Sequence, residues 1–234
     1  MPASCTIHVV VFDLDDTLYP ERQYVRSGYG AAAAALARQR GESESPRRWA
    51  NWLWKRFLGG QTQDAFGALS AAFGLQLTQE QIAELVNVYR SHQPAIRPWA
   101  DMVELLGRLR SRHALGLLSD GYLPGQQRKL DALKLGRFFD AIVFTEALGR
   151  DAWKPAKAGF ERIASLLDTA HGRCAYVADN PAKDFLAPNE LGWRTVQSLR
   201  AGQLHAANPA PSGGEPQVAA YDPGGIRAAL YERR

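Results

Sequence analysis

The stretch IHVVVFDLDDTLYP, residues 7–20, decides the interpretation of the fold. Its apolar half is typical of a short strand buried on both faces, as in sheets covered by helices on both sides. The strand runs directly into Asp13, Asp15 and Asp16, whose negative charges repel one another. Such crowding is stable only if cations or hydrogen-bond donors from elsewhere offset it. The groups that offset it are therefore the clue to function.

Further apolar runs of the same kind follow along the chain, with helical periodicity between them. Alternation of strand and helix indicates right-handed crossovers and a parallel sheet, so the sequence predicts an α/β, doubly wound fold. The expected strands are HVVVF (8–12), ALGLL (114–118), AIVF (141–144), AYVA (175–178) and WRTV (193–196), and the expected helices are 101–111, 126–135, 157–167 and about 183–191.

Residues 20–97 interrupt this alternation, because they show helical periodicity and no convincing strand. They lie between the first and second core strands, so we expect an inserted all-helical subdomain. Trp49, Trp52 and Trp54 stand close together in it, and aromatic packing inside a small bundle is favoured over a stacking platform for a base or sugar. The four expected helices are 21–40, 46–58, 62–73 and 78–91.

The last part of the chain differs in composition from the rest. Residues 206–225 are rich in Pro, Gly and Ala, which predicts a mobile loop or linker, and GIRAALYERR predicts a short closing helix. The basic residues at this end lack interleaved aromatics, so surface charge is favoured over nucleic-acid binding. The expected domains are a core of 1–19 and 98–205, a helical cap of 20–97, and a Pro/Gly-rich linker with a C-terminal segment, 206–234.

Composition favours a globular enzyme or binding protein. The chain has 234 residues, is 46% hydrophobic and carries a formal net charge of +4, which fits a well-buried core and a solvated surface. Cys5 and Cys174 are far apart and match no metal-binding spacing, so reduced thiols are expected. With no basic leader and no apolar stretch near the ~20 residues that cross a bilayer, we expect a soluble, cytoplasmic protein without a membrane partner.

The carboxylates after the first strand predict a metal site. Alternate residues of a strand point the same way, about 6.6 Å apart, so Asp13 and Asp15 both project from its carboxyl end. In an open parallel sheet that end binds ligands. Mg²⁺ takes about six oxygen ligands at about 2.1 Å and suits such groups. A calcium loop of the EF-hand type is excluded, because Leu18 and Tyr24 stand where Gly and Glu are required.

Residues after later strands complete the predicted site. Ser119, Asp120 and Gly121 follow the second strand and could cradle a phosphate, although the same residues would also make an ordinary turn. Lys154 stands before Pro155, which suits the first turn of a helix; taken alone it would be a surface lysine.

Two more aspartates follow the fourth strand. Asp179 falls at the strand terminus, and Asp184 either returns to the site or caps the next helix. If both join Asp13 and Asp15, four negative charges converge. Lys154 and Mg²⁺ would then offset them with +1 and +2. We therefore expect these four aspartates to be the metal site.

These residues resemble, in order, the four motifs of the haloacid dehalogenase-like (HAD) hydrolase superfamily. The resemblance covers about Ile7 to Val196 and implies a Rossmann-like core with a helical C1 cap, typical of its phosphatase branch. Ala178, where glycine is frequent, and Asp120, where asparagine is also common, are minor departures. The motifs are carried by Asp13 and Asp15, by Ser119, by Lys154, and by Asp179 with Asp184.

The resemblance implies a chemistry for each motif. Asp13 would attack phosphorus to form an aspartyl-phosphate, and Asp15 would protonate the departing alcohol and later deprotonate the attacking water. Because free aspartate has a pKa near 3.9, Asp15 would need neighbouring negative charge to raise it. Ser119 and Lys154 would hold the transferring phosphoryl group.

The resemblance also implies the metal ligands. Asp13, Asp179 and the backbone carbonyl of Asp15 would hold Mg²⁺, and Asp184 would bind it directly or orient its water.

Family membership leaves other functions open. A 2-haloacid dehalogenase of this fold needs no metal and generally lacks the second aspartate, so Asp15 argues against it. A phosphomutase and a catalytically idle binding module remain alternatives. The first motif resembles those of sugar-phosphate phosphatases, such as acylneuraminate-9-phosphatases, and of pyrimidine nucleotidases, so the expected partner is a small phosphorylated metabolite. Candidate substrate contacts, each with an equally plausible packing role, are Tyr19, Arg22, Tyr24, Arg26 and Tyr122.

Overall fold

The structure is a computed structural model that describes residues 6–41 and 45–231. The chain forms two compact units. One combines the residues up to Glu21 with those from Arg97 onward, and the other runs from Arg22 to Ile96. Across the two described ranges, every helix is too short or too polar to span a bilayer.

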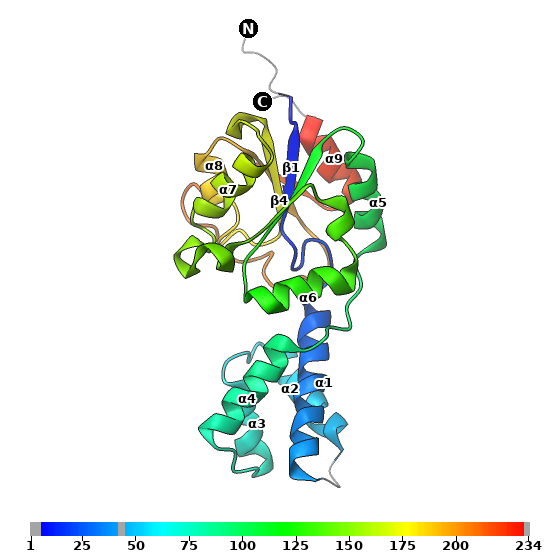
Figure 1. Cartoon of the computed structure of the whole chain (residues 1–234), viewed down its shortest axis with the longest axis vertical. Helices are drawn as coiled ribbons and strands as arrows, with labels where there is room; N and C mark the ends of the chain where they lie inside the picture. The colour runs from blue at the N-terminus through cyan, green and yellow to red at the C-terminus, as the bar shows by residue number, and fades with distance from the viewer. Residues whose placement is uncertain (1–5, 42–44, 232–234) are drawn as a thin grey trace. The chain divides into compact units, whose positions relative to one another are not determined.

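A six-stranded parallel sheet forms the centre of the first unit, with strand order β3-β2-β1-β4-β5-β6 (Figure 1). Successive connections run outward from β1 in one direction and then from β4 in the other. The topological switch point therefore lies between β1 and β4, where ligands of such sheets bind. The strands are β1 (Val9–Phe12), β2 (Ala114–Ser119), β3 (Ala141–Phe144), β4 (Cys174–Ala178), β5 (Arg194–Ser198) and β6 (Val218–Ala220).

Helices cover both faces of this sheet, which explains why its central strands are apolar on both sides. In Figure 1, α7 and α8 lie on one side of the sheet and α5 and α9 on the other. The predicted doubly wound α/β fold is confirmed. The helices are α5 (Ala100–Leu109), α6 (Leu123–Leu133), α7 (Ala158–Leu166), α8 (Leu186–Glu190) and α9 (Pro223–Tyr231), with 3₁₀ turns at Gly136–Phe138, Thr145–Leu148, Arg150–Ala152 and His171–Arg173.

The core between the sheet and α7 is tightly packed. Four of its side chains are fully buried, those of Val11, Phe160, Ile163 and Tyr176. A Cβ at Gly116 of β2 would lie 2.7 Å from the Ile163 side chain, so glycine lets α7 approach the sheet closely. Cys174 is also buried here with a free thiol, whereas Cys5 lies outside the described residues.

The Pro/Gly-rich segment at the end of the chain is not a linker throughout, so that prediction is wrong. Val218–Ala220 adds β6 to the edge of the sheet, in register with Val196 to Ser198 of β5. Helix α9 then packs against β5, β6 and α5. The strand was missed because it has only three residues and is flanked by Pro, Gly and Asp, which locally favour a loop.

The second unit is all-helical and has its own core. Trp49 and Leu53 are fully or almost fully buried, Trp52 meets the Phe73 ring edge-on, and Trp54 stacks on Phe57. The tryptophans thus pack within the bundle, as the sequence favours. Its helices are α1 (Glu21–Arg40), α2 (Pro46–Leu58), α3 (Ala65–Phe73) and α4 (Gln79–Ser91), and α4 begins at a capping box formed by Thr78 and Gln81.

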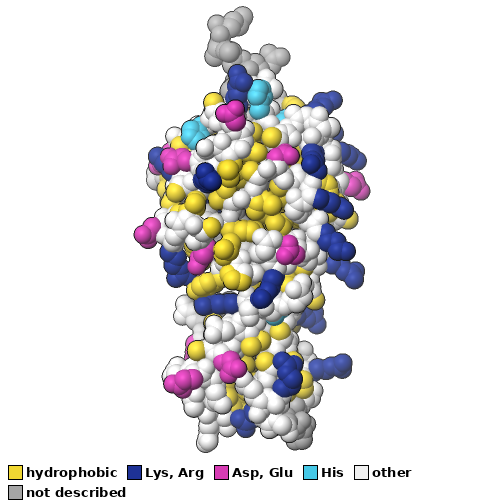
Figure 2. All heavy atoms as spheres, in the orientation of Figure 1, with side chains coloured by type: hydrophobic (Ala, Val, Ile, Leu, Met, Phe, Trp, Pro, Cys, Tyr) yellow, Lys and Arg dark blue, Asp and Glu magenta, His cyan; other side chains and the backbone are white. Residues whose placement is uncertain are grey.

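Surface charge is mixed in sign. On the face seen in Figure 2, Lys and Arg side chains are spread widely, with Asp and Glu between them. This pattern fits a solvated surface.

Candidate active site

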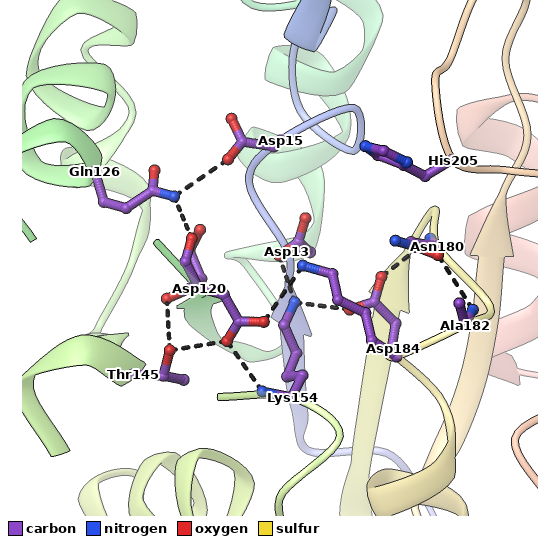
Figure 3. A network of polar contacts seen from close by, with 12 residues as sticks. Asp13, Asp15, Asp120, Gln126, Thr145, Lys154, Asn180, Ala182, Asp184 and His205 are labelled. Carbon is purple, nitrogen blue, oxygen red and sulfur yellow. Dashed lines mark hydrogen bonds and ion pairs between the residues drawn. The ribbon is translucent and has the colours of Figure 1, made fainter. Parts of the chain in front are cut away.

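A buried lysine joins two of the predicted aspartates at the carboxyl end of the sheet (Figure 3). Nζ of Lys154 lies 2.6 Å from Oδ1 of Asp13 and 2.7 Å from Oδ1 of Asp184, and it donates to the Tyr176 hydroxyl at 2.9 Å. Burial alone would lower the pKa of Lys154, but Asp13 and Asp184 raise it well above its usual value. The lysine is therefore charged and fixed between β1 and the loop after β4.

The carboxylates around this lysine cannot all be ionised without strong repulsion. Burial raises the pKa of Asp13 to about 7, with Lys154 opposing and Asp184 adding to the shift. The pKa of Asp179 rises to about 9, because the residue is buried and lies near Asp184 and Asp13. Oδ2 of Asp179 is buried and has no hydrogen-bond partner among the described residues. One lysine is thus insufficient to balance this group.

The Asp15 side chain lies apart from that group and faces α6. Nζ of Lys129 is 2.8 Å from both of its carboxylate oxygens, Nε2 of Gln126 donates to Oδ2 at 3.2 Å, and the Tyr19 hydroxyl donates to Oδ1. Burial would raise the pKa of Asp15, but these three partners lower it. These partners therefore favour the ionised carboxylate, and a pKa raised by neighbouring negative charge, including that of a substrate, stays a prediction. Lys129 could not be placed there from the sequence.

Asp16 has a third kind of partner. Its carboxylate accepts hydrogen bonds from the backbone N–H groups of Glu21, at 2.7 Å, and Leu204, at 2.6 Å. Burial raises the pKa of Asp16 to about 6, and those two hydrogen bonds oppose the rise. The repulsion after β1 is thus offset separately for each carboxylate: by one lysine, by another lysine, and by backbone amides.

The turn after β2 contains the predicted phosphate cradle. Oγ of Ser119 is buried, with no hydrogen-bond partner in the part of the chain that the structure describes. Gly121 has φ of 125°, and a Cβ there would lie 2.4 Å from Nε2 of Gln126, so this turn requires glycine.

The side chain of Asp120 faces away from a phosphate-binding role, so only its backbone N–H remains for the predicted cradle. Its carboxylate accepts from Thr145 Oγ1 at 2.8 Å, from the backbone N–H of Lys154 at 3.2 Å and from Lys183 Nζ at 3.3 Å. Burial would raise the pKa of Asp120, but Lys154, Lys183 and the hydrogen bonds lower it. An ionised carboxylate repels phosphate; instead it anchors the loop that carries Lys154. That loop precedes α7, which begins at Ala158. The prediction that Lys154 lies in the first turn of a helix is therefore wrong.

The family model for haloacid dehalogenase-like hydrolases matches residues 7–192, which is more than half of the chain. The chain belongs to this family. The resemblance noted in the sequence is therefore confirmed, and the protein is a HAD hydrolase.

Known proteins similar to this HAD hydrolase include both phosphatases and dehalogenases. The glyceraldehyde 3-phosphate phosphatase of Methanopyrus kandleri is 28% identical over 209 residues, 87% of this chain and 88% of the relative. The HAD-hydrolase YfnB of Bacillus subtilis, described as bound to magnesium, has a TM-score of 0.67 at 16% identity over 97% of this chain and 100% of that one. A 2-haloacid dehalogenase of Pseudomonas syringae has a TM-score of 0.64 at 20% identity, covering 96% and 98%. The two solved structures share the fold alone.

The residues of this HAD hydrolase fit a magnesium ion, although not as a cluster of four carboxylates. Within residues 6–41 and 45–231, no three side chains of His, Cys, Asp or Glu converge as ligands. Asp15 points to Lys129, and Oδ2 of Asp184 accepts from the backbone N–H of Asn180 at 3.0 Å. The pKa of Asp179 is raised by burial and by neighbouring carboxylates, and its unpartnered oxygen is what an added cation would satisfy.

Sequence reasoning missed several residues of the site. Lys129, Gln126, Thr145 and Lys183 all contact predicted aspartates. Of these four, Lys183 lies within a marked motif, between Asp179 and Asp184, and the other three lie outside the motifs. A signal existed for two of them. Gln126 and Lys129 are three residues apart, so they share one face of the predicted helix that follows the Ser119 turn.

Three of the five candidate substrate contacts, the tyrosines, have hydrogen-bond partners of their own. The Tyr24 hydroxyl donates weakly to the carbonyls of Tyr89 and Arg90, at 3.4 and 3.3 Å, inside the helical unit. Tyr122 accepts from Arg150 at 3.0 Å. Tyr19 is fully buried against Asp15. Tyr24 thus has a packing role, and Tyr19 contacts Asp15.

Proposed function

We propose that this HAD hydrolase is a Mg²⁺-dependent phosphatase that cleaves a small phosphomonoester through an aspartyl-phosphate at Asp13. The observation that carries the proposal is the buried Lys154 held at 2.6 Å from Asp13 and 2.7 Å from Asp184. This contact supports the proposal, because phosphoryl transfer requires a fixed cation beside the carboxylate that would act as nucleophile.

In the first step a carboxylate oxygen of Asp13 attacks phosphorus, and the bond between phosphorus and the ester oxygen breaks. Asp15 gives a proton to the departing alkoxide, after the negative charge of the bound phosphate ester has raised the pKa of Asp15. Ser119 Oγ, free of other described partners, and Lys154 Nζ hold the phosphoryl oxygens. The step balances in charge, because Asp13 loses its negative charge on forming the aspartyl-phosphate and Asp15 becomes a carboxylate when it gives up its proton.

In the second step Asp15 removes a proton from water, which attacks the phosphorus of the aspartyl-phosphate. Inorganic phosphate leaves and the Asp13 carboxylate is restored. The presence of Asp15 favours a phosphate ester over an alkyl halide, because halide leaves without a proton.

The side chains of Asp13 and Asp179 and the backbone carbonyl of Asp15 would hold Mg²⁺, which neutralises the negative charge of the phosphoryl group. Asp184 serves a different purpose in this proposal. Its two oxygens bind Lys154 and the Asn180 amide, so it holds the lysine in place.

The best first substrate is a phosphorylated sugar of triose size. This choice rests on the Methanopyrus kandleri relative, named a glyceraldehyde 3-phosphate phosphatase, whose matched region covers 87% of the present chain. Larger sugar phosphates and nucleotides belong in the same panel.

The test measures phosphate release from that panel with Mg²⁺ and with EDTA, for wild type and Asp13→Asn. We expect release that requires Mg²⁺ and is lost in the variant. Formation of an isomer without free phosphate would indicate a phosphomutase, and metal-independent halide release from a 2-haloacid would indicate a dehalogenase. An Asp13→Asn variant of undiminished activity would contradict the proposed nucleophile.

A further inference from the structure

We propose that Lys129 is a positioning residue that fixes the carboxylate of Asp15 for proton transfer. The inference rests on the proposed phosphatase activity, in which Asp15 is the acid and base. Lys129 belongs to none of the motifs that identify the family. Its assignment comes from the contact itself, in which Nζ lies 2.8 Å from both Oδ1 and Oδ2 of Asp15.

Three donors from two parts of the chain hold this carboxylate. Lys129 and Gln126 come from one face of α6, whereas Tyr19 comes from the turn after β1. The lysine bridges both oxygens, and each of the other two donors binds one of them. The plane of the carboxylate is therefore set as well as its position. Phosphoryl transfer depends on such orientation, because a proton must be delivered along one line.

Stability alone is a weak reason for this lysine. Its side chain is 7% exposed and that of Asp15 is 19% exposed, so both charges are largely desolvated. A buried ion pair of this kind adds little net stability compared with apolar residues of similar size. Its neighbours on α6, Leu130 and Leu133, are buried apolar side chains, so an apolar residue would also suit this face. The lysine instead fixes the orientation of the Asp15 carboxylate.

Lys129 and Lys154 have separate roles. Lys154 binds Asp13 and Asp184, whereas Lys129 binds Asp15. If Lys129 instead contacted the substrate phosphate, its removal would raise KM. A positioning role lowers kcat and leaves KM almost unchanged.

The test compares Lys129→Met, which keeps the length of the side chain, with Lys129→Arg, which keeps its charge. Lys134→Met is the matched control, because Lys134 is exposed at the end of the same helix. Each variant is assayed with two substrates, glyceraldehyde 3-phosphate and p-nitrophenyl phosphate. The alkoxide leaving group of the first needs a proton, and the nitrophenolate of the second does not.

For Lys129→Met we expect kcat on the alkyl phosphate to fall by about 10²-fold, the scale of general acid–base catalysis. KM should change by less than about threefold, as for a group that acts only on the reacting state. With p-nitrophenyl phosphate, the first turnover should stay near the wild-type rate while later turnovers slow, because hydrolysis of the aspartyl-phosphate still needs Asp15. Lys129→Arg should recover much of the loss.

Equal losses on both substrates in the first turnover, or a Lys129→Met variant as active as Lys134→Met, would overturn the positioning role while leaving the phosphatase intact. A raised KM with normal kcat would also overturn it. A wild-type chain that releases phosphate from no member of the panel would overturn the proposed function, and this inference with it. If Lys129→Met does not fold, Gln126→Met supplies the same test, with a smaller loss expected in the same direction.

Discussion

Nζ of Lys154 lies 2.6 Å from Oδ1 of Asp13, although 141 positions separate the two residues in the sequence. The contact joins the loop before α7 to the end of β1. Asp184 shares the same ammonium at 2.7 Å, so one lysine compensates two buried carboxylates. This arrangement explains how the chain tolerates aspartates at the centre of its sheet edge.

Replacing Lys154 with Met should destabilise the fold by about 3–5 kcal/mol, because it leaves buried charges without their partner. It should also abolish phosphate release. Urea unfolding followed by circular dichroism measures the first effect. Lys157→Met is the control, since the Lys157 pair with Glu190 is about half exposed and its loss should change stability little. Equal effects of the two substitutions would contradict the assigned role of Lys154.

Magnesium should stabilise the protein against heat. The pKa of Asp179 is raised to about 9 by burial and by Asp184 and Asp13, so the ionised group is costly without a cation. Melting temperatures in Mg²⁺ and in EDTA measure the effect. For a chain of this size, each kcal/mol of added stability raises the melting temperature by roughly 2–4 °C. In Asp179→Asn the repulsion is reduced, so we expect a higher melting temperature in EDTA and little response to Mg²⁺. A response equal to that of wild type would exclude Asp179 as a ligand.

Gly121→Ala should destabilise the fold by about 1–3 kcal/mol, because a φ of 125° strains any residue with a Cβ. It should also lower activity, since the new methyl group displaces Gln126, which binds Asp15. Gly107→Ala is the control. This position is within α5, and a Cβ there meets no described atom within 4 Å apart from the backbone of its own helix. Alanine should therefore stabilise the fold by about 1 kcal/mol. Chemical unfolding measures the two changes in stability, which should have opposite signs. A Gly121→Ala variant as stable as wild type would contradict the strained turn.

His113 should make stability fall in mild acid. Its Nδ1–H donates to the Ile7 carbonyl at 3.1 Å, and Nε2 accepts from the Tyr231 hydroxyl at 2.9 Å. Burial lowers the pKa of His113, and the nearby charges of Arg112 and His8 lower it further. The unfolded chain then binds the proton more readily, so this contribution is present above about pH 6.5 and is lost as the pH falls through the folded pKa.

The measurement for His113 compares unfolding free energies of wild type and His113→Gln at pH 7.5 and pH 5.5. The advantage of wild type should shrink at the lower pH. If the difference in unfolding free energy is the same at both pH values, the pKa of His113 is the same in the folded and unfolded chain, which would contradict the prediction.

The sheet could be predicted from the sequence because its strands are short apolar runs between turn residues. The central strands end within one or two residues of the expected positions. The edge strand β6 was missed for the opposite reason. Its pairing with β5 depends on a contact across the fold, and Val218–Ala220 has no local pattern that distinguishes it from a loop.

In the candidate site too, residues marked by local sequence could be predicted, and residues placed by distant contacts could not. Asp13 and Asp179 are fixed by strand ends, which the sequence marks. Lys129 is fixed by a partner 114 positions away, and a lysine on a helix normally faces solvent. The orientation of Asp15 followed from that contact, so it could not be predicted.

The account depends most on Asp13 as the nucleophile, and trapping the intermediate tests this directly. Enzyme that is turning over substrate is quenched in acid and reduced with borohydride, which converts an aspartyl-phosphate to homoserine. Mass spectrometry then locates the change. We expect homoserine at position 13. With p-nitrophenyl phosphate, whose leaving group needs no proton, the yield should be larger in Asp15→Asn because hydrolysis of the intermediate is slowed. Unmodified Asp13, or modification of another aspartate, under conditions where phosphate is released would contradict the account.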